Sequence, residues 1–310
     1  MPLQIRCPHC QRVCQVAAGQ AGVLRCPYCN QLFRLASDSA MAPLTLKGTP
    51  RLEVAGFTIT GNARERNEDA LLIRLTSWSE GENWHDAALL VVADGMGGYR
   101  GGDQAAQMTI RAVGHALDFL FDGALLGRFR DTSLGQIAET VEFALQDVSR
   151  QIYQRGQQEA QLQGMGATVV LALIWSGQVL IYHVGDTRAY LSRAGRFQQI
   201  TKDQTLVARM VELGQLSPEE ARHHPKRHEV SQALGKRLTV EPGRYQMDLQ
   251  PGDWLVLSSD GLHADLEESA IASLVSRHQG SARQLTELLA RAAVHAGGSD
   301  NITVVAATYA

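Results

Sequence analysis

Six short apolar runs rich in β-branched residues, most of them followed by glycine or aspartate, constrain the fold of this 310-residue chain most strongly. They are EVAGFTIT (53–60), ALLVVADG (88–95), ATVVLALIW (167–175), QVLIYHVGD (178–186), DWLVLSSDG (253–261) and ITVVAATY (302–309). Runs of this length that are bounded by turn residues predict strands. Ser176-Gly177 joins the third run to the fourth, which predicts an antiparallel hairpin.

Helical periodicity occupies the intervals between these runs. Apolar residues recur at a spacing of three to four over 103–121 and 134–158, and over shorter segments near 205–213, 268–277 and 282–296. The predicted strands come in clusters with long helices between the clusters, not in regular strand–helix alternation. This order favours an α+β fold that layers sheets and helices.

The chain divides into three stretches of different composition. Residues 1–35 hold all five cysteines, residues 36–52 are rich in Ser, Ala, Thr and Pro without clear periodicity, and residues 53–310 are patterned throughout. We therefore predict a small N-terminal module, a linker and one large domain with these boundaries.

Overall composition is ordinary for a globular protein. Hydrophobic residues make up 45% and charged residues 20% of the chain, and the formal net charge is −3, which gives no reason to expect nucleic acid or a membrane as the main partner. The longest strongly apolar run, 167–175, is far shorter than the roughly 20 residues that a membrane-spanning helix needs. With no leader pattern at the N-terminus, we expect a cytoplasmic protein.

Two Cys-x-x-Cys pairs separated by fifteen residues lie in the N-terminal module. The four cysteines are Cys7, Cys10, Cys26 and Cys29. Four thiolates at this spacing suit one tetrahedral Zn²⁺. A segment this small buries too little apolar surface to fold alone, and structural zinc supplies about 10–16 kcal/mol of apparent binding free energy to such peptides. We predict a zinc ribbon with one structural Zn²⁺, and two disulfides are the alternative.

The role of this module is less constrained than its fold. Residues 1–35 contain four arginines and no acidic residue, a composition compatible with nucleic-acid binding. Scattered arginines are more often a solvated or protein-docking surface, so we favour docking and keep a ribbon-led nucleic-acid-associated protein as an alternative. Cys14 is either a spare thiol or a competing ligand.

Acidic residues recur at the ends of the predicted strands. Asp94, Asp186 and Asp260 each close an apolar run, Asp300 precedes the last run, and Glu68-Asp69 lead into an early strand. A single aspartate after a strand is more often a turn or cap residue. If all the strands pack into one sandwich, however, the carboxylates converge, and bound cations would be needed to keep them all ionised. The candidate ligands are all carboxylates, so the site offers oxygens, which suit Mg²⁺ or Mn²⁺.

Seven motifs in a fixed order carry a family resemblance. They are RERNED, DGMGG, GATVVLALI, VGDTRAY, ITKDQTLVARM, SSDG and GGSDNIT. In this order they resemble the bacterial form of the type 2C metal-dependent protein serine/threonine phosphatases over residues 53–310. The resemblance implies a four-layer α/β/β/α sandwich of two antiparallel sheets flanked by helices, with metals in a cleft at one edge.

The same resemblance implies a reaction. It is the hydrolysis of phosphoserine and phosphothreonine esters by water activated at a dinuclear Mg²⁺ or Mn²⁺ centre, with a possible third ion and no covalent phospho-enzyme. The absence of cysteine from residues 53–310 agrees with a reaction that needs no thiolate nucleophile.

Individual metal ligands are implied by position within the motifs. Asp94 resembles the carboxylate that bridges the two metals, and the carbonyl of Gly95 resembles a ligand of one of them. Asp260 and Asp300 resemble ligands of the second metal, which Glu68 reaches through water.

Three further residues have implied roles. Asp69 resembles the residue that orients metal-bound water, and Asp186, together with Asp260, matches the position of a third metal. Arg64 resembles the arginine that grips the substrate phosphate, a task that suits a planar guanidinium with forked donors.

The chain departs from the family pattern at two places. Met96 stands where animal members carry a histidine suited to protonating the leaving alkoxide, so the general acid stays unidentified. Gln204-Thr205 replaces a frequent His-Ser pair at the start of a flap over about 203–235, and we expect this change to affect substrate preference more than catalysis. Within the flap, HHPKRH (223–228) is interpreted as a polar surface loop, and a metal site or a contact with the phosphopeptide is the alternative.

The implied partners are phosphorylated serine/threonine proteins and the pathway of a cognate serine/threonine protein kinase. The first alternative is a phosphoprotein-sensing module of the same fold without turnover. Such proteins usually lose metal carboxylates, whereas Asp94, Asp260 and Asp300 are all present.

Overall fold

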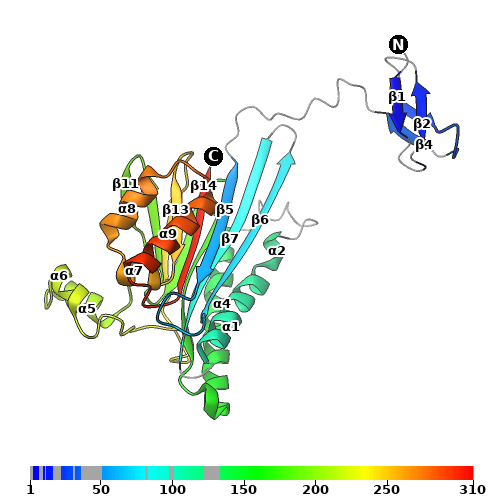
Figure 1. Ribbon diagram of the computed structural model, residues 1–310. Coiled ribbons are helices and arrows are strands. Elements are labelled where there is room, and N and C mark those ends of the chain that lie inside the picture. The colour runs from blue at the N-terminus through cyan, green and yellow to red at the C-terminus, as the bar shows by residue number, and fades with distance from the viewer. Residues whose placement is uncertain are drawn as a thin grey trace. The chain divides into compact units, whose positions relative to one another are not determined.

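The computed structural model describes residues 3–6, 10, 12–16, 22–30, 32–35, 51–80, 83–97, 101–121 and 133–309. The chain forms two compact units, Met1–Thr49 and Pro50–Ala310 (Figure 1). Among the helices described, none combines the length and the apolar character needed to cross a membrane.

The described part of the first unit consists of two antiparallel hairpins. Strand β1 (Leu3–Arg6) pairs with β2 (Val13–Val16), and β3 (Gly22–Arg25) pairs with β4 (Leu32–Leu35). The turn after β3 carries Cys26 and Cys29.

Two five-stranded antiparallel sheets form the centre of the larger unit. The first has the order β11-β10-β13-β14-β5, with β5 (Leu52–Ile59), β10 (Arg188–Arg193), β11 (Arg196–Gln199), β13 (Trp254–Ser258) and β14 (Ile302–Tyr309). The second has the order β12-β9-β8-β7-β6, with β6 (Asp69–Glu80), β7 (Asn83–Met96), β8 (Gly166–Trp175), β9 (Gln178–Val184) and β12 (Gly243–Asp248). The predicted α+β class with antiparallel sheets is confirmed.

The inner faces of the two sheets share one buried apolar cluster. Leu90 and Val92 of β7 and Ile181 of β9 belong to the same cluster as Leu257 of β13 and Val305 of β14. Side chains alternate between the two faces of a strand, so the intervening residues of β7 point to the outer face of its sheet. Because both faces of β7 and β8 are covered, these strands are almost continuously apolar in sequence.

Helices cover the outer faces of the sheets. Helices α1 (Gly101–Ala116) and α4 (Leu134–Gln158) share a buried cluster with β7, β8 and β9, whereas α8 (Glu268–Arg277) and α9 (Ala282–Ala296) share another with β13 and β14. Figure 1 shows α9 lying across β14 and β5. The shorter helices are α2 (Asp118–Phe121), η3 (Ala160–Leu162), α5 (Leu206–Glu212), α6 (Pro218–His223) and α7 (Gly261–Asp265).

Local sequence explains where several of these elements begin and turn. Helices α4, α6 and α9 each start with a capping box, formed by Ser133, Ser217 and Ser281 with the residue three positions later. The predicted hairpin is confirmed: Ser176 (φ 46°) and Gly177 (φ 85°) join β8 to β9 in the left-handed conformation that tight hairpin turns require.

Candidate active site

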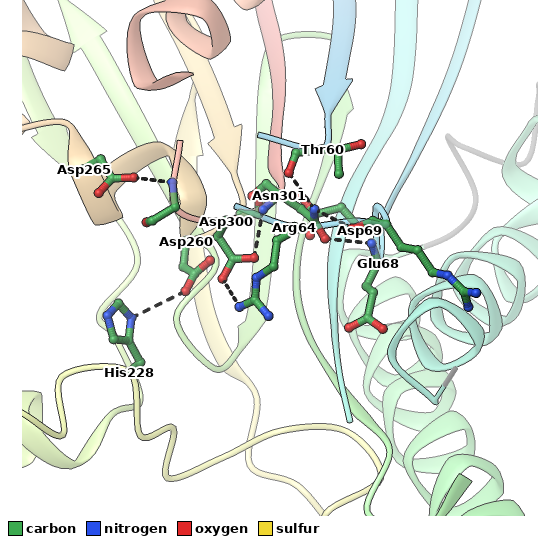
Figure 2. A network of polar contacts seen from close by, with 12 residues as sticks. Thr60, Arg64, Glu68, Asp69, His228, Asp260, Asp265, Asp300 and Asn301 are labelled. Atoms are coloured by element: carbon green, nitrogen blue, oxygen red, sulfur yellow. Dashed lines mark hydrogen bonds and ion pairs between the residues drawn. The ribbon is translucent and has the colours of Figure 1, made fainter. Parts of the chain in front are cut away.

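Strand ends bring the predicted aspartates to one edge of the two sheets. Asp69 begins β6 and is paired in register with Asp94 near the end of β7. Asp186 follows β9, Asp260 follows β13, and Asp300 precedes β14. Neighbouring antiparallel strands run in opposite directions, so the start of one strand lies beside the end of the next. In Figure 2, Asp260 and Asp300 lie beside Arg64, with Glu68 and Asp69 nearby.

Burial and the charges of neighbouring aspartates raise the pKa values of three of these carboxyls. Burial alone would also raise the pKa of Asp260, but its contact with His228 and the charge of His263 hold that pKa below its usual value. Burial raises the pKa of Asp69 to about 7, and the charges of Asp260 and Asp300 act in the same direction. Burial, followed by the charge of Asp260, also raises the pKa values of Asp94 and Asp186 well above their usual range. Such a group of like charges calls for a compensating cation.

Two buried carboxylate oxygens also lack a hydrogen-bond donor. Asp69 Oδ2 accepts a hydrogen bond from Ser259 Oγ at 2.7 Å, but Asp69 Oδ1 and Asp260 Oδ1 have no partner among the described residues. A buried carboxylate oxygen without a donor is costly unless a cation or an ordered water engages it. Both atoms are therefore available to a metal ion or to its water.

The donor set fits hydrated divalent cations. Apart from a cysteine group in the first unit, no three Asp, Glu, His or Cys side chains of the described residues bring ligand atoms within 4.8 Å of one another. Mg²⁺ typically keeps several waters and takes only one or two carboxylates. Oxygen ligands at a partly open edge fit Mg²⁺ or Mn²⁺.

Glycines allow Glu68 to approach this edge closely. A Cβ on Gly102 would lie 2.5 Å from Glu68 Oε2, and a Cβ on Gly95 would lie 2.1 Å from the Gly102 carbonyl oxygen. Neither contact is possible for a larger residue without displacement of the backbone or of Glu68. Burial raises the pKa of Glu68, and the charge of Asp103 adds to the shift. The glycine-rich turn therefore permits the packing of α1 against Glu68.

Arg64 lies at the rim of the carboxylate cluster. Its Nη2 donates to Asp300 Oδ2 at 2.6 Å, and its side chain is 54% exposed. The ion pair holds one arm of the guanidinium against the cluster (Figure 2), while the exposed part of the fork can meet a ligand from solvent. This is a suitable position for a residue that binds an oxyanion.

Asn301 is a structural residue of the site that sequence reasoning missed. Its Oδ1 accepts from Glu68 N at 2.8 Å, and its Nδ2 donates to the carbonyl oxygens of Thr60 at 2.9 Å and Arg66 at 2.8 Å. The side chain therefore fixes the loop that carries Arg64 and Glu68 to the start of β14 (Figure 2). Its position next to Asp300 in GGSDNIT was the available signal.

His228 is a second residue whose placement the sequence did not indicate. Residues 225–228 are exposed, as expected for a polar surface loop, but His228 Nδ1 lies 3.9 Å from Asp260 Oδ2. The end of the HHPKRH segment therefore reaches the carboxylate cluster (Figure 2).

Comparison with known proteins decides the family. Residues 62–296 match the family described as protein phosphatase 2C. The chain belongs to the protein phosphatase 2C family. The predicted resemblance to bacterial phosphatases of this type is thereby confirmed.

Bacterial relatives and solved structures agree with this assignment. Protein phosphatase PhpP of Streptococcus pneumoniae is 33% identical over 254 residues, covering 82% of this chain and 96% of PhpP. The serine/threonine phosphatase of S. agalactiae superposes with a TM-score of 0.72 and 31% identity, covering 84% of this chain and all of that one (100%). The catalytic domain of PstP, solved with two manganese ions, gives a TM-score of 0.66 and 30% identity over 83% of this chain and 97% of its own.

The cysteines lie outside the region that matches the protein phosphatase 2C family. Cys10, Cys26 and Cys29 bring their Sγ atoms within 4.8 Å of one another, and Cys14 Sγ lies 3.8 Å from Cys26 Sγ. Cys7, the fourth predicted ligand, lies outside the described residues. The zinc ribbon stays a prediction.

Proposed function

We propose that this protein is a metal-dependent phosphatase that hydrolyses phosphoserine and phosphothreonine esters in proteins. Its membership of the protein phosphatase 2C family supports this function. The observation that carries it is the convergence of five aspartates from separate strand ends, with buried oxygens that have no donor. These are the features that a hydrolytic metal centre needs and that a purely structural sheet edge does not.

We infer the metal ligands from the resemblance of the sequence motifs to the family pattern, and the convergence of the strand ends supports them. Asp94, Asp260, Asp300 and the Gly95 carbonyl would hold two Mg²⁺ or Mn²⁺ ions, with Glu68 acting through water. Asp186, together with Asp260, would hold a third ion. When bound, such ions lower the pKa of water and stabilise negative charge on phosphoryl oxygens. The two manganese ions in the PstP structure support the same number here.

The side chains around the cluster position the reactants. Arg64 would bind two phosphate oxygens with its forked donors and hold the ester in line for attack. Asp69, fixed by Ser259 through Oδ2, presents Oδ1 without a donor, so that this atom can accept a hydrogen bond from the attacking water. Met96 has no proton to donate, so this position supplies no acid for the leaving alkoxide.

The decisive experiment compares the wild type with Asp94→Asn on a phosphothreonine peptide, with Mn²⁺ and with chelator. We expect hydrolysis only with Mn²⁺, and a loss of at least about a hundredfold in kcat/KM for the variant. Asp147→Asn, which changes a half-buried aspartate of α4 outside the carboxylate cluster, is the matched control and should retain wild-type activity. Equal rates for all proteins in Mn²⁺ and in chelator would refute the proposal.

For the N-terminal unit we propose a zinc ribbon over 1–35, followed by a linker over 36–52 and the phosphatase domain over 53–310. Cys7, Cys10, Cys26 and Cys29 would hold one Zn²⁺, and the approach of three of their sulfur atoms supports this site. Metal analysis of the full chain should give one zinc per chain and a marked loss in Cys26→Ser. Equal zinc in both proteins would exclude the site.

Three further statements stay predictions. A cognate serine/threonine protein kinase would supply the phosphorylated partners, and the ribbon would serve as a docking module. The cytoplasmic location likewise rests on the sequence alone.

A further inference from the structure

A cavity of about 840 Å³ adjoins the carboxylate cluster. Asp186 and Asp260 form part of its wall, and helices α5 and α6 of the flap and the connection from α7 to α8 form much of the rest. Figure 1 shows α5 and α6 to the side of α7, away from the sheets. The volume of the cavity lies within the roughly 300–1,000 Å³ that small-ligand sites occupy. The cavity is therefore large enough to hold several side-chain or backbone groups of a polypeptide in addition to the phosphate.

The flap that bounds this cavity is attached at its base. Thr205 and Val230 form an isolated antiparallel bridge, and Leu206 N donates to Glu229 O at 2.9 Å. Val207 and Val211 of α5 contribute apolar lining. The two ends of the segment 205–230 are thus held side by side. Several residues between them, mainly from α5 and α6, form one wall of the cavity.

Three basic side chains of the flap have acidic partners. Arg209 lies 2.8 Å from Glu212, Arg222 lies 2.9 Å from Glu267, and Lys226 lies 3.3 Å from Glu229. Arg227 also lines the cavity, but it has no acidic partner within 4.0 Å among the described residues. An arginine without a partner presents its whole fork of donors to a ligand.

Arg227 is close to the carboxylate cluster because the next residue, His228, approaches Asp260. His228 lies 3.9 Å from Asp260, and consecutive Cα atoms are about 3.8 Å apart, so Arg227 stands one residue from a direct contact with the cluster. A phosphorylated residue bound at the cluster would therefore place its chain neighbours within reach of Arg227.

The start of α8 also contributes a charge to the cavity. Glu268 lines the cavity and has no basic partner among the described residues. Glu268 repels an acidic ligand at the start of α8, whereas Arg227 attracts one at the flap. Charge complementarity therefore favours an acidic side chain beside Arg227.

We propose that this cavity receives the substrate residues on one side of the phosphoserine or phosphothreonine, and that Arg227 binds an Asp or Glu side chain among them. The inference rests on the proposed phosphatase function and adds to it a substrate class, namely phosphoproteins with an acidic residue close to the phosphorylated one.

Three phosphothreonine peptides test the proposal with the full chain in Mn²⁺. One has only alanine beside the phosphothreonine, one has glutamates in the two preceding positions, and one has them in the two following positions. We expect the wild type to show about three to five times higher kcat/KM for one glutamate peptide than for the alanine peptide, as befits a partly exposed charge pair. Arg227→Ala should reduce that ratio to about one.

Lys226→Ala provides the matched control. Lys226 is the neighbouring exposed cation, pairs with Glu229 and does not line the cavity, so its removal should leave the ratio unchanged. Arg227→Lys, which keeps the charge but loses the fork, should give an intermediate ratio.

The experiment distinguishes failure of the acidic subsite from failure of the proposed phosphatase function. Hydrolysis of all three peptides at equal kcat/KM by the wild type would overturn the acidic subsite and leave the phosphatase function intact. An equal fall in the ratio for Arg227→Ala and Lys226→Ala would also overturn it, because general surface charge would then explain the preference. No hydrolysis of any peptide in Mn²⁺ would overturn the proposed function and this inference with it.

Discussion

Gln204 and Gly185 exchange two hydrogen bonds at the base of the flap. Gln204 N donates to Gly185 O at 2.8 Å, and Gly185 N donates to Gln204 Oε1 at 2.9 Å. The other side-chain atom, Nε2, donates to Glu241 O at 2.9 Å, and the Gln204 carbonyl accepts from Ser231 N at 2.8 Å. One residue therefore connects both ends of the flap to the residue that precedes Asp186. The departure from the family pattern at Gln204 has a defined structural role.

Replacing Gln204 by alanine should loosen this connection. The variant loses two side-chain hydrogen bonds, each worth about 0.5–1.5 kcal/mol net, so the free energy of unfolding should fall by about 1–3 kcal/mol. Urea denaturation measures this loss, and limited trypsin digestion should cut the flap faster at its Arg and Lys residues. Gln151→Ala, an exposed change on α4, should stay within about 0.5 kcal/mol of the wild type. Unchanged stability and unchanged cleavage in Gln204→Ala would contradict this role.

Arg64 should not tolerate lysine. Its guanidinium donates to Asp300 at 2.6 Å and is expected to grip phosphate with the rest of its fork, whereas lysine offers a single point charge. We expect Arg64→Lys to lower kcat/KM on a phosphothreonine peptide by about a hundredfold. Arg150→Lys, which alters a half-exposed arginine of α4, is the control and should be neutral. Wild-type kcat/KM in Arg64→Lys would exclude a phosphate-binding role.

The sequence predicted the elements that are regular along the chain. The long helices α4, α8 and α9 and the hairpin of β8 and β9 were predicted because their apolar periodicity or turn residues are local properties. Strands β10, β11 and β12 were not predicted. The sequence of β10, RAYLSR, mixes polar with apolar residues and forms no apolar run. Strands β11 and β12 lie at sheet edges, and the residues of β12 alternate between exposed and half-buried.

The site, too, has one part that the sequence predicted and one part that it did not. Its aspartates could be predicted because each one follows or precedes an apolar strand, and their order matched a family. The contacts of Asn301 with the loop before β6, and of His228 with Asp260, depend on segments that are distant in sequence and meet only in the folded chain. The position of Asn301 beside Asp300 in GGSDNIT was a local signal, but neither it nor any periodicity predicts these contacts.

The buried pair of Arg188 and Asp203 should contribute strongly to stability. Arg188 Nε and Nη2 donate to the two Asp203 oxygens at 2.9 and 2.6 Å, and their side chains are only 18% and 16% exposed. Burial alone would raise the pKa of Asp203, but the charge of Arg188 outweighs it and holds the pKa below its usual value. Asp203→Asn leaves a buried guanidinium without its counter-ion, so we expect a loss of about 3–5 kcal/mol in urea denaturation.

The pH dependence of this pair gives a further check on the same variant. Because the folded pKa of Asp203 lies below the unfolded one, its stabilisation is complete above about pH 4 and is lost as the pH falls through the folded pKa. The difference in stability between wild type and Asp203→Asn should therefore shrink in acid. A loss below about 1 kcal/mol at neutral pH would show that the pair is dispensable.

Mn²⁺ should stabilise the protein more at high pH than at low pH. The pKa of Asp69 is raised to about 7 in the metal-free site, and those of Asp94 and Asp186 are raised as well. Since the folded values exceed the unfolded ones, the folded metal-free protein binds extra protons from about pH 4 to pH 7 and loses stability as the pH rises through this range. Mn²⁺ needs the ionised carboxylates, so protons compete with it below about pH 7.

Thermal unfolding in Mn²⁺ and in chelator, at pH 5.5 and at pH 8, measures this competition. At pH 8 and Mn²⁺ about a hundredfold above its Kd, the stabilisation is about 2.7 kcal/mol, which corresponds to a rise in Tm of roughly 5–10 °C. The rise should be clearly smaller at pH 5.5, and Asp94→Asn should show a reduced rise at both values. Because the comparison is made at fixed pH, the titration of His183 and His263, whose pKa values burial lowers, largely cancels. An identical rise in Tm at the two pH values would mean that the aspartate cluster does not bind the metal.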